Sequence, residues 1–251
     1  MIFISIFQKN MTPKKIGPFL LGALIFLFFD CRAQDSETIQ ITGLVTDYSG
    51  NPQDSVFVVA MNKNFSPNAS TFTDADGQYH LELQKGKFMA LLAVRMHEYP
   101  RFSSLPAKEQ RLEYWAWNFI ADKDTVINIK YHRLEIYGLN VFKIHGASPG
   151  YTIYCRPMSL TRLQNEMTDI APDPDELEIT VEINGKPVSV NMAQKVNEFI
   201  EEGELYGYLL HVDFKADLDK SRYDVFRIYM KDTTTGDKGE AIYFLEKSDY
   251  Y

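Results

Sequence analysis

Residues 38–47 read Thr-Ile-Gln-Ile-Thr-Gly-Leu-Val-Thr-Asp, a stretch in which apolar and polar side chains alternate. Successive side chains of a β-strand point to opposite faces, so this alternation predicts a strand with one buried face. Residues 48–52, Tyr-Ser-Gly-Asn-Pro, follow with the residue types that favour a tight turn. The stretch therefore predicts a strand and a turn at the start of a β-rich domain.

More apolar runs follow, separated by turn residues. The runs that predict strands are residues 54–61, 70–73, 78–83 and 87–94. Asp74-Ala-Asp-Gly77 separates the second of these runs from the third. Because glycine takes the positive φ that a tight turn requires, we predict that these two runs pair as a hairpin.

Five segments of this region share their order and spacing with a known family. They are Ile-Thr-Gly-Leu-Val-Thr-Asp, Gly50-Asn51-Pro52, Val56-Phe-Val-Val, Thr73-Asp-Ala-Asp-Gly77-Gln-Tyr79 and Gly86. Across residues 39–94 the chain resembles the carboxypeptidase regulatory-like domain, which implies a transthyretin-like β-sandwich. Such domains are common in exported proteins of the Bacteroidota and are not catalytic. The resemblance thus implies a fold and a cellular setting, without a reaction.

Further strands up to residue 144 complete the first sandwich, and the residues after them predict a second β-rich domain. Strands are expected at residues 114–120, 124–130, 134–144, 151–154, 206–216, 223–231 and 241–245. Gly146-Ala-Ser-Pro-Gly150 marks the best boundary by composition, so we place the two domains at residues 35–143 and 144–251. Asn184-Gly185 predicts a hairpin between residues 176–183 and 186–190.

One short helix is expected in the second domain, over residues 191–203. Asn191 is a capping residue type, and Gly203 lies where a helix would end. Met192, Val196, Phe199 and Ile200 would share one helical face. Residues 162–175 are polar and are expected to form a loop. The fold class is therefore all-β: a transthyretin-like sandwich, then a second β-sandwich-like domain with one short helix. An immunoglobulin-like sandwich is one arrangement for this second domain.

The first 33 residues have the layout of a secretory signal peptide. Residues 11–15 carry two lysines, residues 16–29 are almost purely apolar, and Cys31-Arg-Ala33 places small residues around a cleavage site. A membrane anchor would need about 20 apolar residues, and this run has about 14. Lipidation of Cys31 is the other alternative, but Asp30 precedes it where a small residue is usual. We therefore expect an exported protein, in the periplasm, at the cell surface or secreted.

Charge and composition exclude several classes of partner. The chain has 251 residues and a net charge of -8. The leader carries four basic residues and one acidic residue, so its removal changes the net charge to -11. No basic run extends beyond Lys14-Lys15, so nucleic acid is not expected as a partner, and neither is membrane insertion after cleavage.

The sequence contains no catalytic motif. His132-Arg-Leu-Glu135 matches the H-x-x-E spacing of some zinc sites, but in a strand the two side chains would point to opposite faces. No serine-elbow or phosphate-loop motif is present, and Asp74 and Asp76 lack the other ligands of a calcium loop. Cys155 lies in an apolar run without a nearby histidine, which favours a buried, inert thiol. We predict no enzyme activity, no cofactor and no metal.

Two groups of residues remain as candidate sites. Trp115 and Trp117 would share one strand face next to Tyr114, and an exposed aromatic row could stack on sugar rings; packing in a core is the alternative. Ser55, Thr125 and Thr233 each follow an aspartate and resemble the acceptor site for O-glycosylation in exported Bacteroidota proteins.

The expected function is a non-catalytic exported or cell-envelope protein that binds a glycan or a protein partner. A structural accessory subunit of an outer-membrane assembly is the first alternative. A glycan- or peptide-directed hydrolase is the second, and two converging carboxylates with raised pKa values in a cleft would favour it.

Overall fold

The computed structural model describes residues 37–247, except residues 145, 147, 148, 168, 201, 202 and 214–220. The predicted signal peptide, with Cys31, lies outside the described residues. Within the described part of the chain, no helix is long and apolar enough to cross a membrane.

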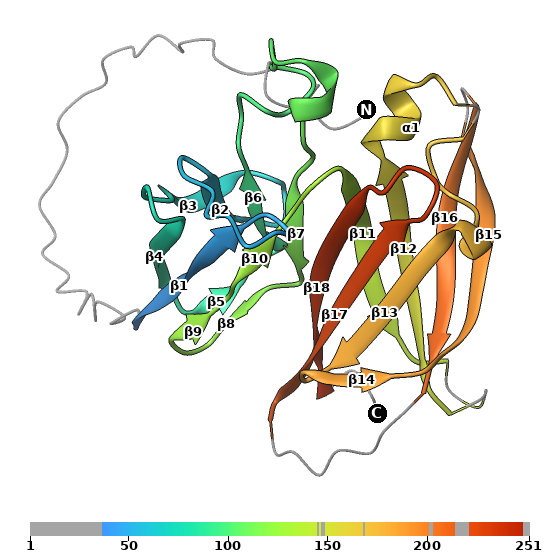
Figure 1. The fold of residues 1–251 in the computed structure, drawn as a ribbon. Coiled ribbons are helices and arrows are strands. Elements are labelled where there is room, and N and C mark those ends of the chain that lie inside the picture. The colour runs from blue at the N-terminus through green and yellow to red at the C-terminus, as the bar shows by residue number, and fades with distance from the viewer. Residues whose placement is uncertain are drawn as a thin grey trace, which may run out of the picture. The chain divides into compact units, whose positions relative to one another are not determined.

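The fold is all-β, as the sequence predicts, and consists of stacked sheets (Figure 1). The largest sheet has eight strands in the order β14 (Lys186–Val188), β13 (Leu177–Ile183), β17 (Tyr223–Asp232), β18 (Lys238–Glu246), β7 (Tyr114–Trp117), β6 (Ala90–Val94), β2 (Phe57–Met61) and β3 (Pro67–Phe72). Two smaller sheets pack against different halves of this sheet.

The first smaller sheet contains β10 (Ile129–Lys130), β1 (Thr38–Thr46) and β4 (Gln78–Gln84), and β9 (Thr125–Val126) also pairs with β1. The second contains β11 (Leu134–Phe142), β12 (Tyr151–Ser159), β16 (Gly203–Val212) and β15 (Val190–Ile200). The remaining elements are β5 (Gly86–Lys87), β8 (Ile120–Ala121), α1 (Leu160–Gln164) and the 3-10 turns η2 (Ala107–Glu109) and η3 (Pro174–Glu176).

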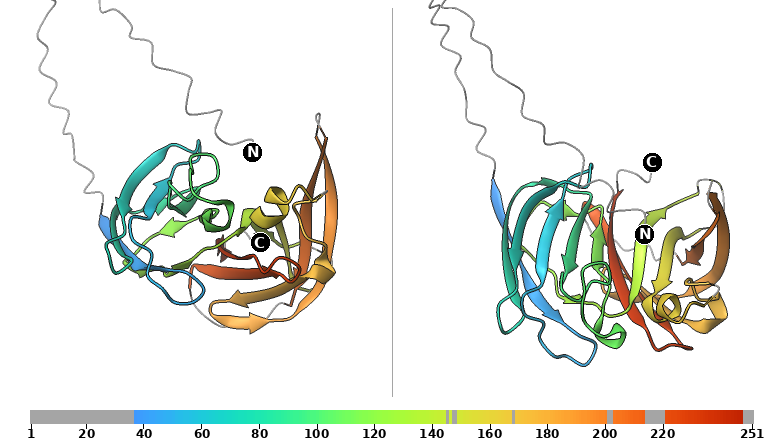
Figure 2. Two further views of the ribbon diagram at one scale, coloured as in Figure 1. Left: turned by 45° about the horizontal axis from the view of Figure 1, so that its top comes forward. Right: turned by 90° about the horizontal axis from the view of Figure 1, so that it is seen from above.

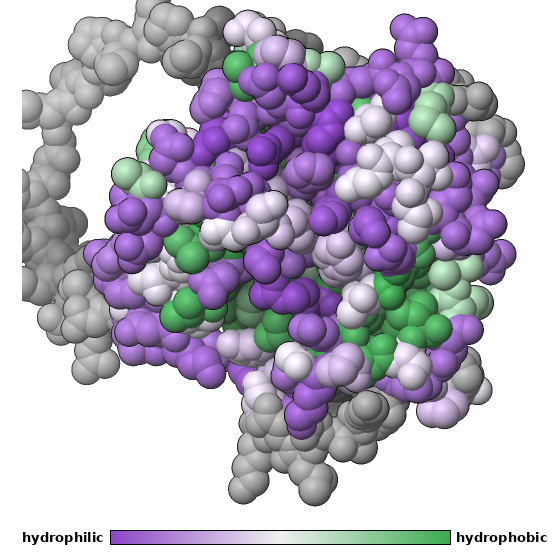
Figure 3. All heavy atoms as spheres, in the orientation of Figure 1, coloured by the Kyte–Doolittle hydropathy of each residue, from purple (hydrophilic) through white to green (hydrophobic). Residues whose placement is uncertain are grey.

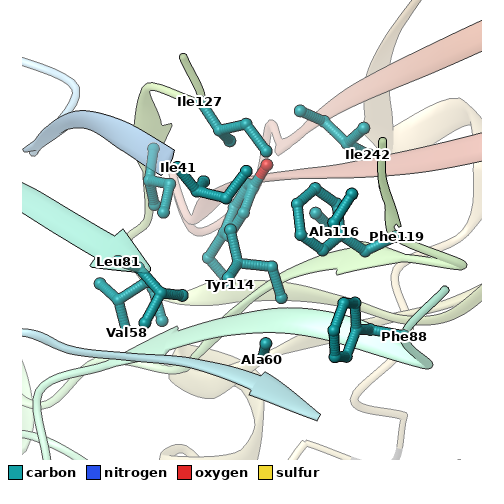
Figure 4. Packing of buried hydrophobic residues seen from close by; sticks show 14 of the residues in the cluster. Ile41, Val58, Ala60, Leu81, Phe88, Tyr114, Ala116, Phe119, Ile127 and Ile242 are labelled. Carbon is teal, nitrogen blue, oxygen red and sulfur yellow. The ribbon is translucent and has the colours of Figure 1, made fainter. Parts of the chain in front are cut away.

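Two hydrophobic cores result, and β7 contributes to both. Tyr114 and Ala116 point into the first core, which lies against β1 and β4 (Figure 4). Trp115 and Trp117 point into the second core, against β11. This division follows from the alternation of side chains along a strand. β17 and β18, drawn in red, lie between the strands of residues 38–130 and those of residues 134–212 (Figure 2).

The eight-stranded sheet contains strands from both sides of the predicted boundary at residue 143. β18 pairs in parallel with β7, with Ala241 opposite Trp115 and Tyr243 opposite Trp117. The division into domains of residues 35–143 and 144–251 stays a prediction.

The helix predicted over residues 191–203 is wrong. This segment forms β15, which pairs with β16 from Val190↔Val212 to Ile200↔Gly203. An isolated helix of this length is marginal, and valine and asparagine are weak helix formers, so pairing with the adjacent strand prevails. The short helix is instead α1, whose last three residues lie in the segment of residues 162–175 that the sequence predicts to be a loop. Ser159 caps it by accepting a hydrogen bond from Arg162 N.

The predicted hairpin around residues 74–77 is also wrong in its pairing. β3 pairs with β2, and β4 pairs with β1, so the turn carries the chain from one sheet to the other. Thr73 fixes this crossing because its hydroxyl donates to Gln53 O and accepts from Val56 N. The hairpin at Asn184-Gly185 is confirmed, with both residues at positive φ between β13 and β14.

Candidate functional site

The three aromatic residues predicted to contact a ligand lie inside the protein. Tyr114, Trp115 and Trp117 are 1%, 5% and 7% exposed. The two tryptophan rings stack with centroids 4.6 Å apart, and Tyr137 packs edge-on against both. Core packing, the alternative that the sequence left open, accounts for this arrangement. Contact of these residues with a ligand stays a prediction.

Two glutamates lie near these tryptophans. Trp115 Nε1 donates a hydrogen bond to Glu135 Oε1 at 2.9 Å. Burial raises the pKa of Glu113 to about 7. Burial, and then the negative charge of Glu113, raise the pKa of Glu135 well above its usual range. A hydrolytic site could use such a pair, but neither glutamate lines either of the two cavities described below.

The H-x-x-E pair is separated in the structure. His132 lines a small cavity with Arg111, whereas Glu135 bonds to Trp115 in the core. Among the described residues, no three potential metal ligands lie together. Cys155 is buried, and burial raises the pKa of its thiol to about 12. A thiol with so high a pKa is almost entirely protonated at neutral pH, which makes it a poor nucleophile.

The predicted modification sites lie in different surroundings. Ser55 and Thr233 are exposed, and Thr125 is half-buried in β9. Thr233 Oγ1 donates to Glu176 O at 2.9 Å, and the preceding Asp232 is buried in an ion pair with Arg162. Their glycosylation stays a prediction.

An open groove of about 820 Å³ lies on the outer face of β1 and β4. Because side chains alternate, Ile41 and Leu81 point into the first core while Thr42, Leu44 and His80 line the groove. Thr42 lies opposite His80 in the ladder. The groove is bordered by Phe72 at the end of β3, by the turn at residues 74–77, and by Val126 of β9. We call it the β1–β4 groove.

The β1–β4 groove combines apolar surface with hydrogen-bonding groups. Phe72 is 62% exposed, Val126 69% and Leu44 38%. Figure 3 shows apolar side chains interrupting the hydrophilic surface around β1, β9 and β10. Asp74 Oδ1 accepts hydrogen bonds from Asp76 N and Gln78 N, which holds the turn in place. An apolar surface with a few fixed polar groups is the usual composition of a small-molecule site.

Sequence reasoning missed this groove. The sequence predicts that Phe72 lies in a hairpin strand, and the residues around it do not show whether the side chain is exposed or lies in a core. The crossing between sheets, which leaves Phe72 uncovered, depends on pairings with β2 and β1 that are distant in the sequence.

Comparisons with known proteins do not assign a family. No family model matches the chain, and neither does any curated protein. Among solved structures, the major pilin BcpA of Bacillus cereus is 12% identical over 83% of this chain and 69% of its own, with a TM-score of 0.27. A protein of Bacteroides uniformis described as a candidate carbohydrate binder is 12% identical over 83% of this chain and 98% of its own, also at 0.27. The major pilin SpaD of Corynebacterium diphtheriae is 9% identical over 82% of this chain and 64% of its own, at 0.24. Scores this low carry no assignment of function.

Proposed function

We propose that this chain is a non-catalytic exported protein of the bacterial envelope that binds a glycan in the β1–β4 groove. The carboxypeptidase regulatory-like pattern of residues 39–94 and the signal-peptide layout of residues 1–33 support the exported setting. The groove supplies an exposed binding surface with both apolar and polar groups.

The observation that carries the proposal is the exposed ring of Phe72 beside fixed polar groups. A sugar ring has an apolar face of C–H groups and a rim of hydroxyls. The C–H face can pack on Phe72, and the rim can bond to Asp76, Gln78 and Thr42. The groove is open and lies on the outer face of a sheet, so an internal section of a long chain can enter it as readily as an end.

The test is a glycan-array screen of the protein from residue 34 onward, followed by titration of the best glycan. We expect Phe72→Ala to weaken binding at least tenfold, because it removes the apolar platform. Phe102→Ala is the matched control: Phe102 is 53% exposed and does not line the groove. Both variants should unfold at nearly the same temperature as the parent protein.

Two results would overturn the proposal. One is a screen in which no glycan binds. The other is a glycan that binds the Phe72→Ala and Phe102→Ala variants equally well. Recovery of a defined outer-membrane complex in place of a glycan would favour the alternative, a structural accessory subunit.

A further inference from the structure

A second, smaller cavity lies where four segments distant in the sequence meet. Its volume is about 190 Å³, several times the share of one liquid water molecule, which is about 30 Å³. Tyr48 comes from the turn after β1, Arg111 from the segment before β7, His132 from the segment before β11, and Lys238 from the start of β18. Asp47, Ser49 and Gly236 complete the lining, and we call the cavity the Arg111 pocket.

Three residues that line the Arg111 pocket each carry a polar atom with no hydrogen-bond partner in the described part of the chain. These atoms are Tyr48 Oη, Arg111 Nη1 and His132 Nδ1, and each is buried. A buried polar group that forms no hydrogen bond destabilises the folded state, so such groups are rare in folded proteins. Three such groups on the lining residues of one cavity leave unused hydrogen-bonding capacity beside it.

The charges around the pocket favour an anion. Lys238 has no ion pair with a described residue, and its Nζ lies 5.7 Å from the centre of the Tyr48 ring. Arg111 reaches Glu98 through Nε at 3.6 Å, which leaves Nη1 for another acceptor. His132 adds no charge at neutral pH, because burial and then the charge of Arg111 lower its pKa to about 4.

The acidic residues near the pocket already have partners. Asp47 accepts hydrogen bonds from Ser49 N, Asn51 N and Asn51 Nδ2. The other three acids each pair with an arginine: Glu98 with Arg95, Asp237 with Arg133, and Glu240 with Arg227. Asp47 keeps its negative charge, which also acts on Arg111. The lining as a whole therefore has two cations, Arg111 and Lys238, against one anion, and this balance favours a negatively charged ligand.

We propose that the Arg111 pocket binds a small oxyanion, held by Arg111, Lys238, Tyr48 and His132. Phosphate, sulfate and carboxylate share the required chemistry: each has several oxygen acceptors and a negative charge. A free inorganic ion and an acidic group on a larger molecule would make the same contacts. The proposal does not depend on the function proposed for the β1–β4 groove.

The test is calorimetric titration of the folded protein with sodium phosphate, sodium sulfate and sodium acetate, at pH 7 and constant ionic strength. Sodium chloride is the control for a non-specific effect of salt. We expect saturable binding of at least one oxyanion and no saturable binding of chloride. Stronger binding of phosphate and sulfate would indicate a tetrahedral group, and stronger binding of acetate a carboxylate.

Variants of the lining residues distinguish the pocket from other basic surfaces. Lys238→Met should weaken binding at least tenfold, and Tyr48→Phe, which removes only a hydroxyl, should weaken it several-fold. Tyr229→Phe is the matched control, because its ring lies 5.7 Å from that of Tyr48 but does not line the pocket. Binding that is equal in all three variants, or no saturable binding up to about 50 mM of any oxyanion, would overturn the proposal.

Discussion

At the scale of single residues, Gly239 lies where two stretches of backbone touch. A Cβ atom at this position in β18 would lie 1.9 Å from Leu134 O of β11. The contacting atom is backbone, so it cannot move aside without a shift of β11. The close packing of β11 on β18 therefore requires glycine here.

We predict that Gly239→Ala lowers the free energy of unfolding by about 3 kcal/mol, at the upper end of the usual cost of overpacking. Gly86→Ala is the control, because the nearest atoms to its Cβ would be side-chain atoms at 3.7 Å. Urea denaturation of both variants measures the difference. Equal stabilities would contradict the close approach.

The pair Glu113 and Glu135 predicts a pH dependence of stability. Both pKa values are raised in the folded protein, Glu113 to about 7, from an ordinary value of 4.5. Between pH 4.5 and about pH 7, the unfolded chain has already released the proton of Glu113 that the folded protein still holds. Stability contributed by the pair is therefore complete at low pH and is lost as the pH rises toward 7 and above.

We expect Glu135→Gln to remove much of this loss, because the amide oxygen still accepts from Trp115 Nε1 but carries no charge. The variant should be more stable than the parent protein at pH 8 by roughly 2 kcal/mol and nearly equal to it at about pH 5. Thermal unfolding across this range measures the effect, with exposed Glu178→Gln as control. An unchanged pH profile in Glu135→Gln would show that the two carboxyl groups do not interact as described.

At the scale of elements, a buried ionic network attaches α1 to the turn between β17 and β18. Arg162 donates to Asp232 through Nε at 2.7 Å, and both side chains are almost completely buried. Although burial alone would raise it, hydrogen bonds from Arg162 and from the turn keep the pKa of Asp232 below its usual value. Asp237 binds the backbone N–H of Thr161, so both ends of the turn hold the helix.

We predict that Asp232→Asn destabilises the protein by about 3 kcal/mol, because it leaves the buried Arg162 charge without its main partner. Lys231→Gln is the matched control on the same strand, where the pair with Glu178 is exposed and its loss should have a much smaller effect. Chemical denaturation compares the two. A larger effect of Lys231→Gln would contradict the role of the network.

How much of this fold the sequence predicts depends on the range of the interactions. The strand of residues 38–46 and the Asn184-Gly185 hairpin follow from neighbouring residues, and both are confirmed. β15 is decided by its pairing with β16, and the crossing at Thr73 by Gln53 and Val56, which local patterns do not contain. The candidate groove and the Arg111 pocket are lined by distant segments, so neither could be found before the fold was known.

At the scale of the whole molecule, the shared eight-stranded sheet ties the two cores together. Ile242 and Phe244 of β18, and Tyr223 of β17, are part of the first core, whose other members come from residues 39–131. Asn118 Nδ2 also donates to Phe244 O at 2.6 Å. Residues near the C-terminus thus complete a core that most of the N-terminal strands build.

We therefore predict that a fragment of residues 36–143 does not fold alone. Burial of an apolar side chain contributes about 1.5–3 kcal/mol, so the loss of Ile242 and Phe244 removes about 3–6 kcal/mol. A whole domain is stable by only about 5–15 kcal/mol, so this loss alone reaches the lower end of that range. The fragment would also uncover the edge of β7 and the faces of Trp115 and Trp117. Residues 36–251 should unfold in one cooperative transition, whereas the fragment should show none and should bind a hydrophobic dye. A cooperative transition in the fragment would contradict this prediction, because it would show that the first core forms without β18 and that residues 36–143 are an independent domain.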